Sequence, residues 1–247
     1  MSNVVSYNTS TASLTSSLNE YIFENGRRYH AYYGTDKNPM PTDDLEQDRL
    51  DIHHELMLRL MDGELHLAPL NNPHRILDVG TGTGIWCIDA ADKYPSSEVI
   101  GTDLSCTKPG GWCEMAEVSL PTHCDDDTAK PGNPTLKWCD AMIEAMEKIN
   151  RPFPSSVQQL TDKLEKAGYV DPVGLWPKDR RLKEVGGMAL MTCETGFEAY
   201  GMQIFTKALG LGTEEAKKIC KDALEDVKKK STHLYCCFWV AYGRKPE

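Results

Sequence analysis

Basic residues are scarce in this chain of 247 residues: 27 lysines and arginines stand against 37 acidic residues, which gives a formal net charge of −10. A protein that holds nucleic acid neutralises its phosphates with basic side chains, so this balance argues against a nucleic-acid partner. The one basic run, Lys228–Lys230, is typical of the last turn of a helix, where cations complement the helix dipole.

The sequence also lacks long apolar runs and paired cysteines. No stretch approaches the roughly 18 apolar residues of a membrane span, and the first residues resemble no secretion signal, so we expect no membrane partner and a cytoplasmic or nuclear location. Nine cysteines include no Cys-x-x-Cys pair, which argues against a disulfide framework or a structural metal site. What is present, 40% hydrophobic and 26% charged residues, is typical of a soluble globular protein, and the length of 247 residues indicates one domain with appendages.

The N-terminal residues change character abruptly. Residues 1–18 contain nine serines and threonines and almost no large apolar side chains, so we predict a disordered tail. A dense aromatic patch with two arginines follows, and we expect it to pack on another part of the protein. Its members are Tyr21, Phe23, Arg27, Arg28, Tyr29, Tyr32 and Tyr33.

An amphipathic helix is predicted next, with Thr42 as its N-cap and Gly63 at its end. Its apolar face would carry Leu45, Ile52, Leu56 and Leu60. The adjacent residues at positions 53–55, His-His-Glu, point to different faces of a helix, so we expect solvated side chains there and no metal site.

A strand–turn–helix–strand pattern occupies residues 75–103. We predict a strand over 75–79, a helix over 85–93 and a second strand in "SEVIGTD". The glycines at 80, 82 and 84 allow a close approach of the backbone to a ligand, and the helix that follows offers free N–H groups. Asp103 ends the second strand, where a carboxylate accepts hydrogen bonds from ribose hydroxyls. The pattern therefore predicts a nucleoside site.

Further elements are predicted toward the C-terminus. "NPTLKWCDAMIEAMEKI" is typical of a helix, and "PSSVQQLTDKLEKAGYV" predicts another, with a capping box in Ser155 and Gln158 and a stop at Gly168. A third helix begins at Thr213, and "LYCCFWVAYGR" predicts a buried final strand.

These motifs carry a family resemblance. "ILDVGTGTGIW" and "EVIGTDLS" resemble the glycine motif and the acidic position of class I methyltransferases that use S-adenosylmethionine (SAM). "FENGRRYHAY", "EQDRLDIHHELML", "DGELHLAP" and "THLYCCFWVAYGRKP" are similar to fungal methyltransferases related to the secondary-metabolism regulator of the velvet complex. The resemblance covers residues of about 21–105 and 108–247.

The resemblance implies an α/β, Rossmann-like class I methyltransferase fold with SAM as cofactor. The residues that would shape the methionine end of the cofactor site are Asp78, Gly80, Thr81, Gly82 and Gly84. Asp103 would hold the ribose. Arg28, Tyr29 and Tyr32 would form a lid or a substrate wall, although plain packing of this segment on the core explains them equally well.

The stretch "IGTDLSCTKPGGW" predicts a shortened core. In the family pattern "KPGGW" precedes the fifth strand, but here it follows the second strand almost at once, so about 60 residues, the third and fourth strands with their helices, are absent. A bare crossover would then leave one face of the sheet uncovered, or else the strand over 112–118 would pair antiparallel or take the place of the missing strand. We predict a tail over 1–18, a helical and aromatic cover over 19–72 and a truncated methyltransferase domain over 73–247.

The predicted function is SAM-dependent methyl transfer to a small metabolite or a protein, in fungal secondary metabolism or its regulation. A non-catalytic partner-binding protein, with a velvet-type regulatory protein as its partner, is the alternative, and a fold reused for another reaction is a third reading. No motif assigns a catalytic base, although Glu117, His123 and His233 are available. The acidic run Asp125–Asp127 is expected to be a solvated loop.

Overall fold

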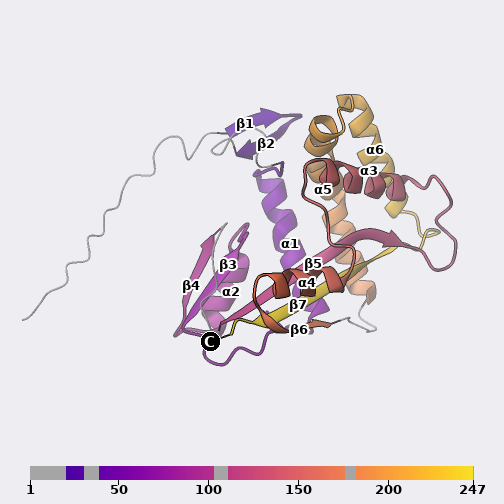
Figure 1. Ribbon diagram of the computed structural model, residues 1–247. Helices are drawn as coiled ribbons and strands as arrows, with labels where there is room; N and C mark the ends of the chain where they lie inside the picture. The colour runs from indigo at the N-terminus through magenta and orange to yellow at the C-terminus, as the bar shows by residue number, and fades with distance from the viewer. Residues whose placement is uncertain (1–20, 31–38, 103–110, 176–181, 247) are drawn as a thin grey trace, which may run out of the picture. The chain divides into compact units, whose positions relative to one another are not determined.

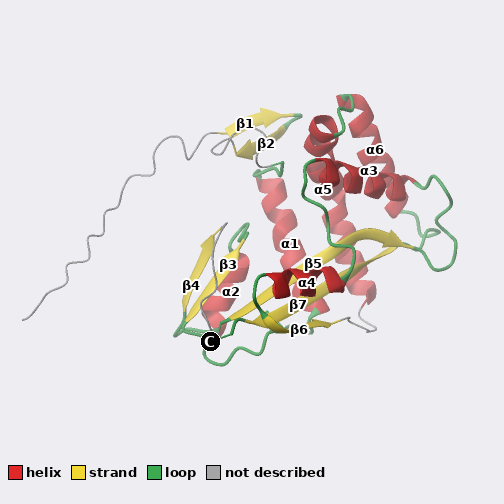
Figure 2. Cartoon of the chain, in the orientation of Figure 1, coloured by secondary structure: helices red, strands yellow, loops and turns green. Residues whose placement is uncertain are grey.

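The computed structural model describes residues 21–30, 39–102, 111–175 and 182–246 (Figure 1). The predicted tail, Tyr32, Tyr33 and Asp103 lie outside the described residues. The chain divides into two compact units, residues 1–43 and 44–247, and each is described by itself. Helices and three small sheets make the fold mixed α/β (Figure 2). Among the described helices, none has the length and apolarity to cross a membrane.

The first unit contains a β-hairpin that the composition of the aromatic patch did not predict. Strands β1 (Tyr21–Glu24) and β2 (Arg27–His30) pair antiparallel. Asn25 and Gly26 join them with φ angles of 52° and 80°, the left-handed pair that a tight hairpin turn requires. The Asn-Gly dipeptide therefore sets the register of the hairpin.

Helix α1 (Asp44–Leu60) opens the second unit and corrects two expectations. It begins at Asp44, so Thr42 is not its cap; the Thr42 hydroxyl instead lies 3.4 Å from the Arg28 carbonyl oxygen. Leu45, expected on the apolar face, is 57% exposed. Buried positions of the helix include Glu46 and Arg49, because an ion pair takes the place of apolar side chains in its first turns.

Three more helices enclose the main apolar core: α3 (Pro134–Lys148), α5 (Leu182–Ala208) and α6 (Thr213–Val227). α3 and α6 were predicted, whereas α5 was not. The run Lys228–Lys230 begins at the residue that caps α6, just beyond the predicted last turn.

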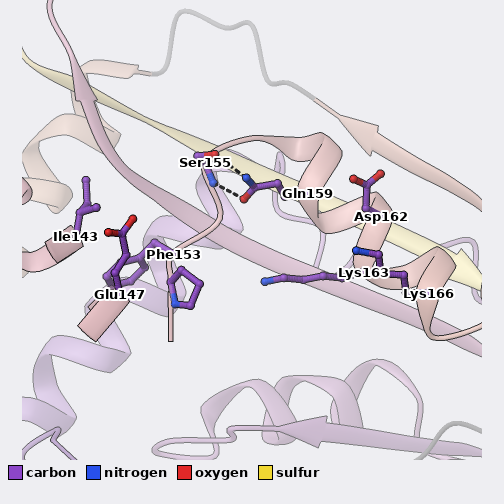
Figure 3. A pocket seen from close by; sticks show the side chains of 9 residues that line it. Ile143, Glu147, Phe153, Ser155, Gln159, Asp162, Lys163 and Lys166 are labelled. Atoms are coloured by element: carbon purple, nitrogen blue, oxygen red, sulfur yellow. Dashed lines mark hydrogen bonds between the residues drawn. The ribbon is translucent and has the colours of Figure 1, made fainter. Parts of the chain in front are cut away.

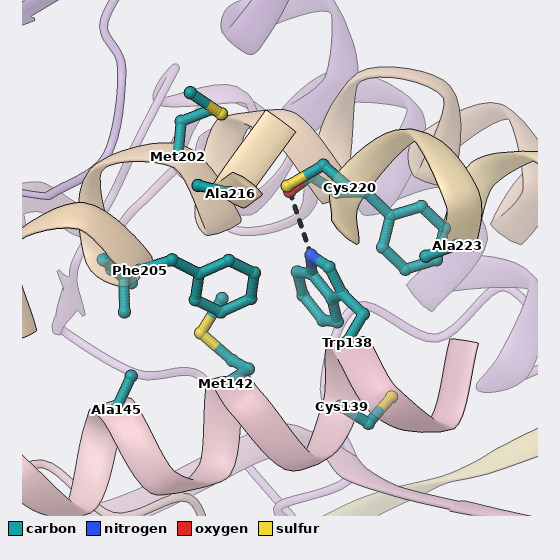
Figure 4. Packing of buried hydrophobic residues seen from close by; sticks show 11 residues of the cluster. Trp138, Cys139, Met142, Ala145, Met202, Phe205, Ala216, Cys220 and Ala223 are labelled. Atoms are coloured by element: carbon teal, nitrogen blue, oxygen red, sulfur yellow. Dashed lines mark hydrogen bonds between the residues drawn. The ribbon is translucent and has the colours of Figure 1, made fainter. Parts of the chain in front are cut away.

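Trp138 of α3 lies at the centre of this core (Figure 4). Its ring meets the Phe197 and Phe205 rings edge-on, and its indole N–H donates to the Phe197 carbonyl oxygen at 3.2 Å. Trp138 thus buries a large apolar surface while keeping its one polar group bonded.

A three-stranded antiparallel sheet forms the C-terminal part, in the order β5–β7–β6. Its strands are β5 (Trp112–His123), β6 (Val170–Leu175) and β7 (Tyr235–Arg244). β7 is central and buried, as predicted. β5, which begins at Trp112, pairs antiparallel with β7.

Helix α4 (Val157–Lys166) covers this sheet through Leu160 and Leu164, which pack with Trp239 and Ala241. Its cap lies one residue later than predicted: the Ser156 side chain accepts from the Gln159 N–H. The left-handed Gly168, with a φ of 83°, follows the helix as expected.

A two-stranded parallel sheet joins β3 (Arg75–Val79) to β4 (Glu98–Thr102), with α2 (Ile85–Lys93) as the crossover. The strands and helix match the predicted bounds to within about one residue. Ile76 is buried with Ala90 of α2 on one side of the sheet. The other side exposes three apolar residues, Leu77, Val79 and Ile100, at 37%, 56% and 44%.

Candidate functional site

The glycine turn, residues 80–84, connects β3 to α2. Gly80, Gly82 and Gly84 have φ angles of 81°, 55° and 82°, in the left-handed region that side chains disfavour. The Gly84 N–H donates to the Thr81 carbonyl oxygen at 2.8 Å and closes the turn. The Gly80 N–H donates to the Thr102 carbonyl oxygen at 2.7 Å, so the carboxyl end of β4 lies beside the turn.

The turn is open where a ligand would approach. A Cβ atom added to Gly80 or Gly84 would meet no atom within 4 Å. α2 begins directly after Gly84, and the first N–H groups of a helix lack partners within it. Open backbone and helix N–H groups together suit a ligand that carries a carboxylate or another anionic group.

Thr81 and Asp78 face β4 and α2. The Thr81 hydroxyl lies 3.4 Å from the Cys87 sulfur, which in turn lies 3.5 Å from a carboxylate oxygen of Asp78. Only glycine fits at the neighbouring position of β4, because a Cβ on Gly101 would lie 2.6 Å from the Thr81 oxygen. Burial raises the pKa of the Cys87 thiol, which therefore keeps its proton.

Helix α1 contacts the turn from another direction. The Thr83 hydroxyl donates to the Asp51 carboxylate at 2.6 Å, and Leu50 lies 3.4 Å from the place of a Cβ on Gly82. His54 bonds Asp89 of α2 at 2.7 Å. Sequence reasoning missed these contacts, because no periodicity or motif pairs a helix residue with a turn 32 positions away.

The histidines of α1 are not the solvated side chains that we expected. The His54 side chain is only 10% exposed, and its ring nitrogen lies 2.7 Å from a carboxylate oxygen of Asp89. Burial, together with the charges of Arg49 and His54, lowers the pKa of His53 to about 4. Because they are adjacent, His53 and His54 point to different faces of the helix, as expected, but both side chains are largely covered by other parts of the protein.

The segment predicted as a lid or substrate wall belongs to the first unit. Arg28 lies over the Tyr21 ring, 5.2 Å from its centre, and donates to the Thr42 carbonyl oxygen at 2.6 Å. Tyr29 is fully buried. Tyr32, and Asp103 of the predicted ribose site, lie outside the described residues. The roles of these four residues therefore remain predictions.

The three available bases have different contacts. Glu117 of β5 has its pKa raised by burial, against the charge of Lys163. The His123 ring lies 5.4 Å from the Tyr235 ring, and exposed His233 pairs with Asp126. The acidic loop is thus tied to the start of β7 rather than simply solvated.

A cleft of about 390 Å³ lies between α3, the following loop and α4 (Figure 3). Its polar wall mixes both charges, with Glu147 and Asp162 against Lys163 and Lys166. Ser155 and Gln159 bond each other at its rim. No residue of the glycine turn lines this cleft.

Comparison with known proteins identifies the family. The family model described as "Methyltransferase domain" matches residues 52–171. Methyltransferase pytC of Aspergillus terreus is 32% identical over 298 aligned positions, which cover 96% of this chain and 92% of that protein. The alignment has more positions than this chain has residues, so some residues of the relative have no counterpart in this chain.

A second relative is the secondary metabolism regulator laeA of Aspergillus fumigatus, 27% identical over 90% of this chain and 76% of its own length. The solved phosphoethanolamine N-methyltransferase 2 of Haemonchus contortus, with S-adenosylhomocysteine, is 12% identical; the match covers 81% of this chain and 53% of that one. Its TM-score of 0.38 is too low to carry an argument. On the identity and coverage of the pytC match, the chain belongs to the methyltransferase family, whose members use S-adenosylmethionine as methyl donor.

Proposed function

We propose that this methyltransferase holds SAM at the glycine turn and methylates a small metabolite or a protein in fungal secondary metabolism, in the cytoplasm or nucleus. The observation that carries the proposal is the open, left-handed backbone of residues 80–84 between β3 and the N-terminus of α2. The relatives from Aspergillus support the metabolic setting.

The residues present fit the cofactor. Gly80 and Gly84 leave open space, and the first N–H groups of α2 suit the carboxylate of its methionine part. Gly82 has less room, with Leu50 beside it. Thr81 would contribute backbone atoms only, because its side chain packs on Gly101. Asp78 would support the turn through Cys87, and Asp103 would accept from the ribose.

The chemistry requires alignment above all. SAM would supply an electrophilic methyl group on a positively charged sulfur; an acceptor in line with the carbon–sulfur bond would bond to the methyl carbon, and S-adenosylhomocysteine would leave. The chain's contribution is to orient the cofactor and to exclude water from the acceptor. Arg28, Tyr29 and Tyr32 would form the lid or substrate wall. None of Glu117, His123 and His233 is assigned as a base, because no described contact ties them to the turn.

We further propose that the core is a Rossmann-like class I fold without its third and fourth strands. In a doubly wound sheet of order 3-2-1-4-5-6, the fourth strand lies between the first and the fifth. β3 and β4 would be the first two strands, and β5 would be the fifth. Removal of the joining strand should leave two sheets, and the described strands form β3–β4 and β5–β7–β6 separately.

Two other observations support this shortening. Both faces of a parallel sheet are normally covered by helices, yet Leu77, Val79 and Ile100 are exposed. The pytC alignment also requires residues in that relative that this chain lacks. We propose the domain limits accordingly: a tail over 1–18, a cover over 19–72 and the shortened core over 73–247.

S-adenosylhomocysteine, the demethylated product, provides the test. At a hundred times its dissociation constant a ligand of the folded state adds about 2.7 kcal/mol to the free energy of unfolding. For a chain of this size the melting temperature should rise by several degrees, at roughly 2–4 °C per kcal/mol. A melting temperature that does not move at millimolar S-adenosylhomocysteine contradicts the proposal.

A non-catalytic, partner-binding protein is the second candidate. The exposed apolar face of β3 and β4 favours it, since such faces mark interaction surfaces. A velvet-type regulatory protein is the partner that we propose for it, by resemblance to laeA. Binding of purified velvet-type protein to a chain that does not bind S-adenosylhomocysteine would favour this candidate.

A further inference from the structure

We propose that Asp51 of α1 is a positioning residue for the cofactor site: through Thr83, it fixes the glycine turn in the conformation that receives SAM. The inference rests on the proposed function of the turn and adds a residue outside the predicted set. It begins from one contact, the 2.6 Å hydrogen bond between the Thr83 hydroxyl and the Asp51 carboxylate.

The turn needs an anchor because of its composition. Three of its five residues are glycines with left-handed backbone, and glycine loses more conformational freedom on folding than any other residue. The two threonines are the positions at which a side chain can hold the turn. Thr81 is held at Gly101 and Cys87, and Thr83 is held at Asp51. Each threonine therefore ties the turn to a different element.

The Thr83 hydroxyl also serves the start of α2. Gly84 stands at the N-cap position and has no side chain to offer. The Ile85 N–H instead lies 3.4 Å from the Thr83 oxygen. Since a hydroxyl has one hydrogen, its donation to Asp51 turns its lone pairs toward this N–H. Asp51 thereby orients the group that caps α2 beside the expected ligand.

Helix α1 is itself held firmly, so Asp51 has a fixed support. Arg49 bonds Glu46 at 2.6 Å and the hydroxyl of Tyr200 on α5 at 2.9 Å. α1 packs along α5. A second contact, His54 with Asp89, joins α1 to the body of α2. Contacts therefore connect α5 to α1, and α1 to the glycine turn.

The hydrogen bond from Thr83 to Asp51 has a charged acceptor. A carboxylate acceptor makes a shorter and stronger bond than a neutral one. In its absence the turn samples other backbone conformations, and the ligand must select the competent fraction. The dissociation constant of S-adenosylhomocysteine should rise roughly three- to tenfold, because part of a charge-assisted bond is lost.

Isothermal titration with S-adenosylhomocysteine on the full chain tests the role. Asp51→Ala and Thr83→Val should both weaken binding by at least the lower end of that range, and the double variant should be no weaker than Thr83→Val, because Thr83→Val already removes the bond to Asp51. Thr83→Ser keeps the hydroxyl, so its affinity should stay near that of the wild type. Asp51→Asn keeps only a neutral acceptor, so its affinity should lie between those of the wild type and Asp51→Ala. Asp48→Ala, an exposed position of the same helix, is the matched control.

The outcomes separate this inference from the proposed function. Wild-type affinity in folded Asp51→Ala and Thr83→Val overturns the positioning role and leaves the cofactor site standing. Absence of binding by the wild type contradicts the cofactor site itself. Should Asp51→Ala fail to fold, the nearly isosteric Thr83→Val carries the test, with amide hydrogen exchange at residues 82–85 as the second measurement.

Discussion

At the scale of single residues, a buried ion pair in α1 is the feature that the sequence reveals least. Arg49 is 5% exposed, pairs with Glu46 and lies 4.8 Å above the centre of the Tyr200 ring. Charged side chains on an amphipathic helix usually lie on its solvent face, so the sequence does not indicate that these two are buried. Their partners are distant in sequence, so no local pattern could reveal them.

His53 gives this buried cluster a dependence on pH. Its folded pKa, about 4, lies below the ordinary value of 6.5 because of burial and the nearby charges of Arg49 and His54. Between these values the unfolded chain binds a proton that the folded chain does not, so stability rises with pH in that window. Above pH 6.5 the contribution of neutral His53 is complete; it is lost as pH falls toward 4.

Urea unfolding of His53→Gln at several pH values measures the effect. Between pH 7 and 4 the wild type should lose about 3 kcal/mol more free energy of unfolding than the variant. His233→Gln is an informative control, since the Asp126 hydrogen bond raises the pKa of His233 and gives the opposite sign. Parallel curves for wild type and His53→Gln would refute the account of His53.

At the scale of elements, α5 shows what the sequence concealed. This helix of 27 residues contains four glycines, residues of low helix propensity, and no alternating or capped pattern marks its start. One of these glycines has a packing role. A Cβ on Gly201 would lie 2.5 Å from the Cys220 sulfur and 2.9 Å from the Trp138 indole nitrogen, so glycine permits the close contact of α5 with α3 and α6.

Two alanine substitutions in α5 should therefore differ in sign. Gly201→Ala overpacks the core and should cost about 1–3 kcal/mol of unfolding free energy. Gly186→Ala adds a Cβ in open space and should stabilise the helix by up to about 1 kcal/mol. Thermal unfolding of both variants measures the difference, and equal effects would show that Gly201 is not a close-packing position.

The elements that the sequence predicts correctly are those marked by local signals. The unit from β3 through α2 to β4 was predicted in the right order, and its observed bounds differ from the predicted ones by about one residue at the ends of β4, because its glycines and apolar runs are local signals. β7 was predicted from its β-branched and aromatic run. β1 and β2 were missed, although Asn25 and Gly26 form a hairpin signal, since the aromatic composition was interpreted as packing surface. The contacts of Asp51 needed the three-dimensional fold.

At the scale of the whole second unit, the sheet β3–β4 and the sheet β5–β7–β6 share no strand pairing among the described residues, but a side chain of β5 bonds the segment before β3. The half-buried Glu114 carboxylate of β5 accepts from the backbone N–H groups of Leu67 and Ala68, at 2.7 Å and 2.6 Å, in the segment that leads to β3. Burial raises the pKa of Glu114 despite these bonds. The Glu114 side chain thus connects the sheet of β5 to the segment that precedes β3.

The most direct test of the cofactor site is the affinity of S-adenosylhomocysteine for Gly84→Ala compared with Gly168→Ala. The two glycines have φ angles of 82° and 83°, and a Cβ on either meets no atom within 4 Å, so the backbone strain is matched. We predict that the wild type and Gly168→Ala bind S-adenosylhomocysteine equally well by isothermal titration, and that Gly84→Ala binds at least about tenfold more weakly. Equal affinity in all three proteins, or no binding in the wild type, would contradict the claim that this turn holds the cofactor.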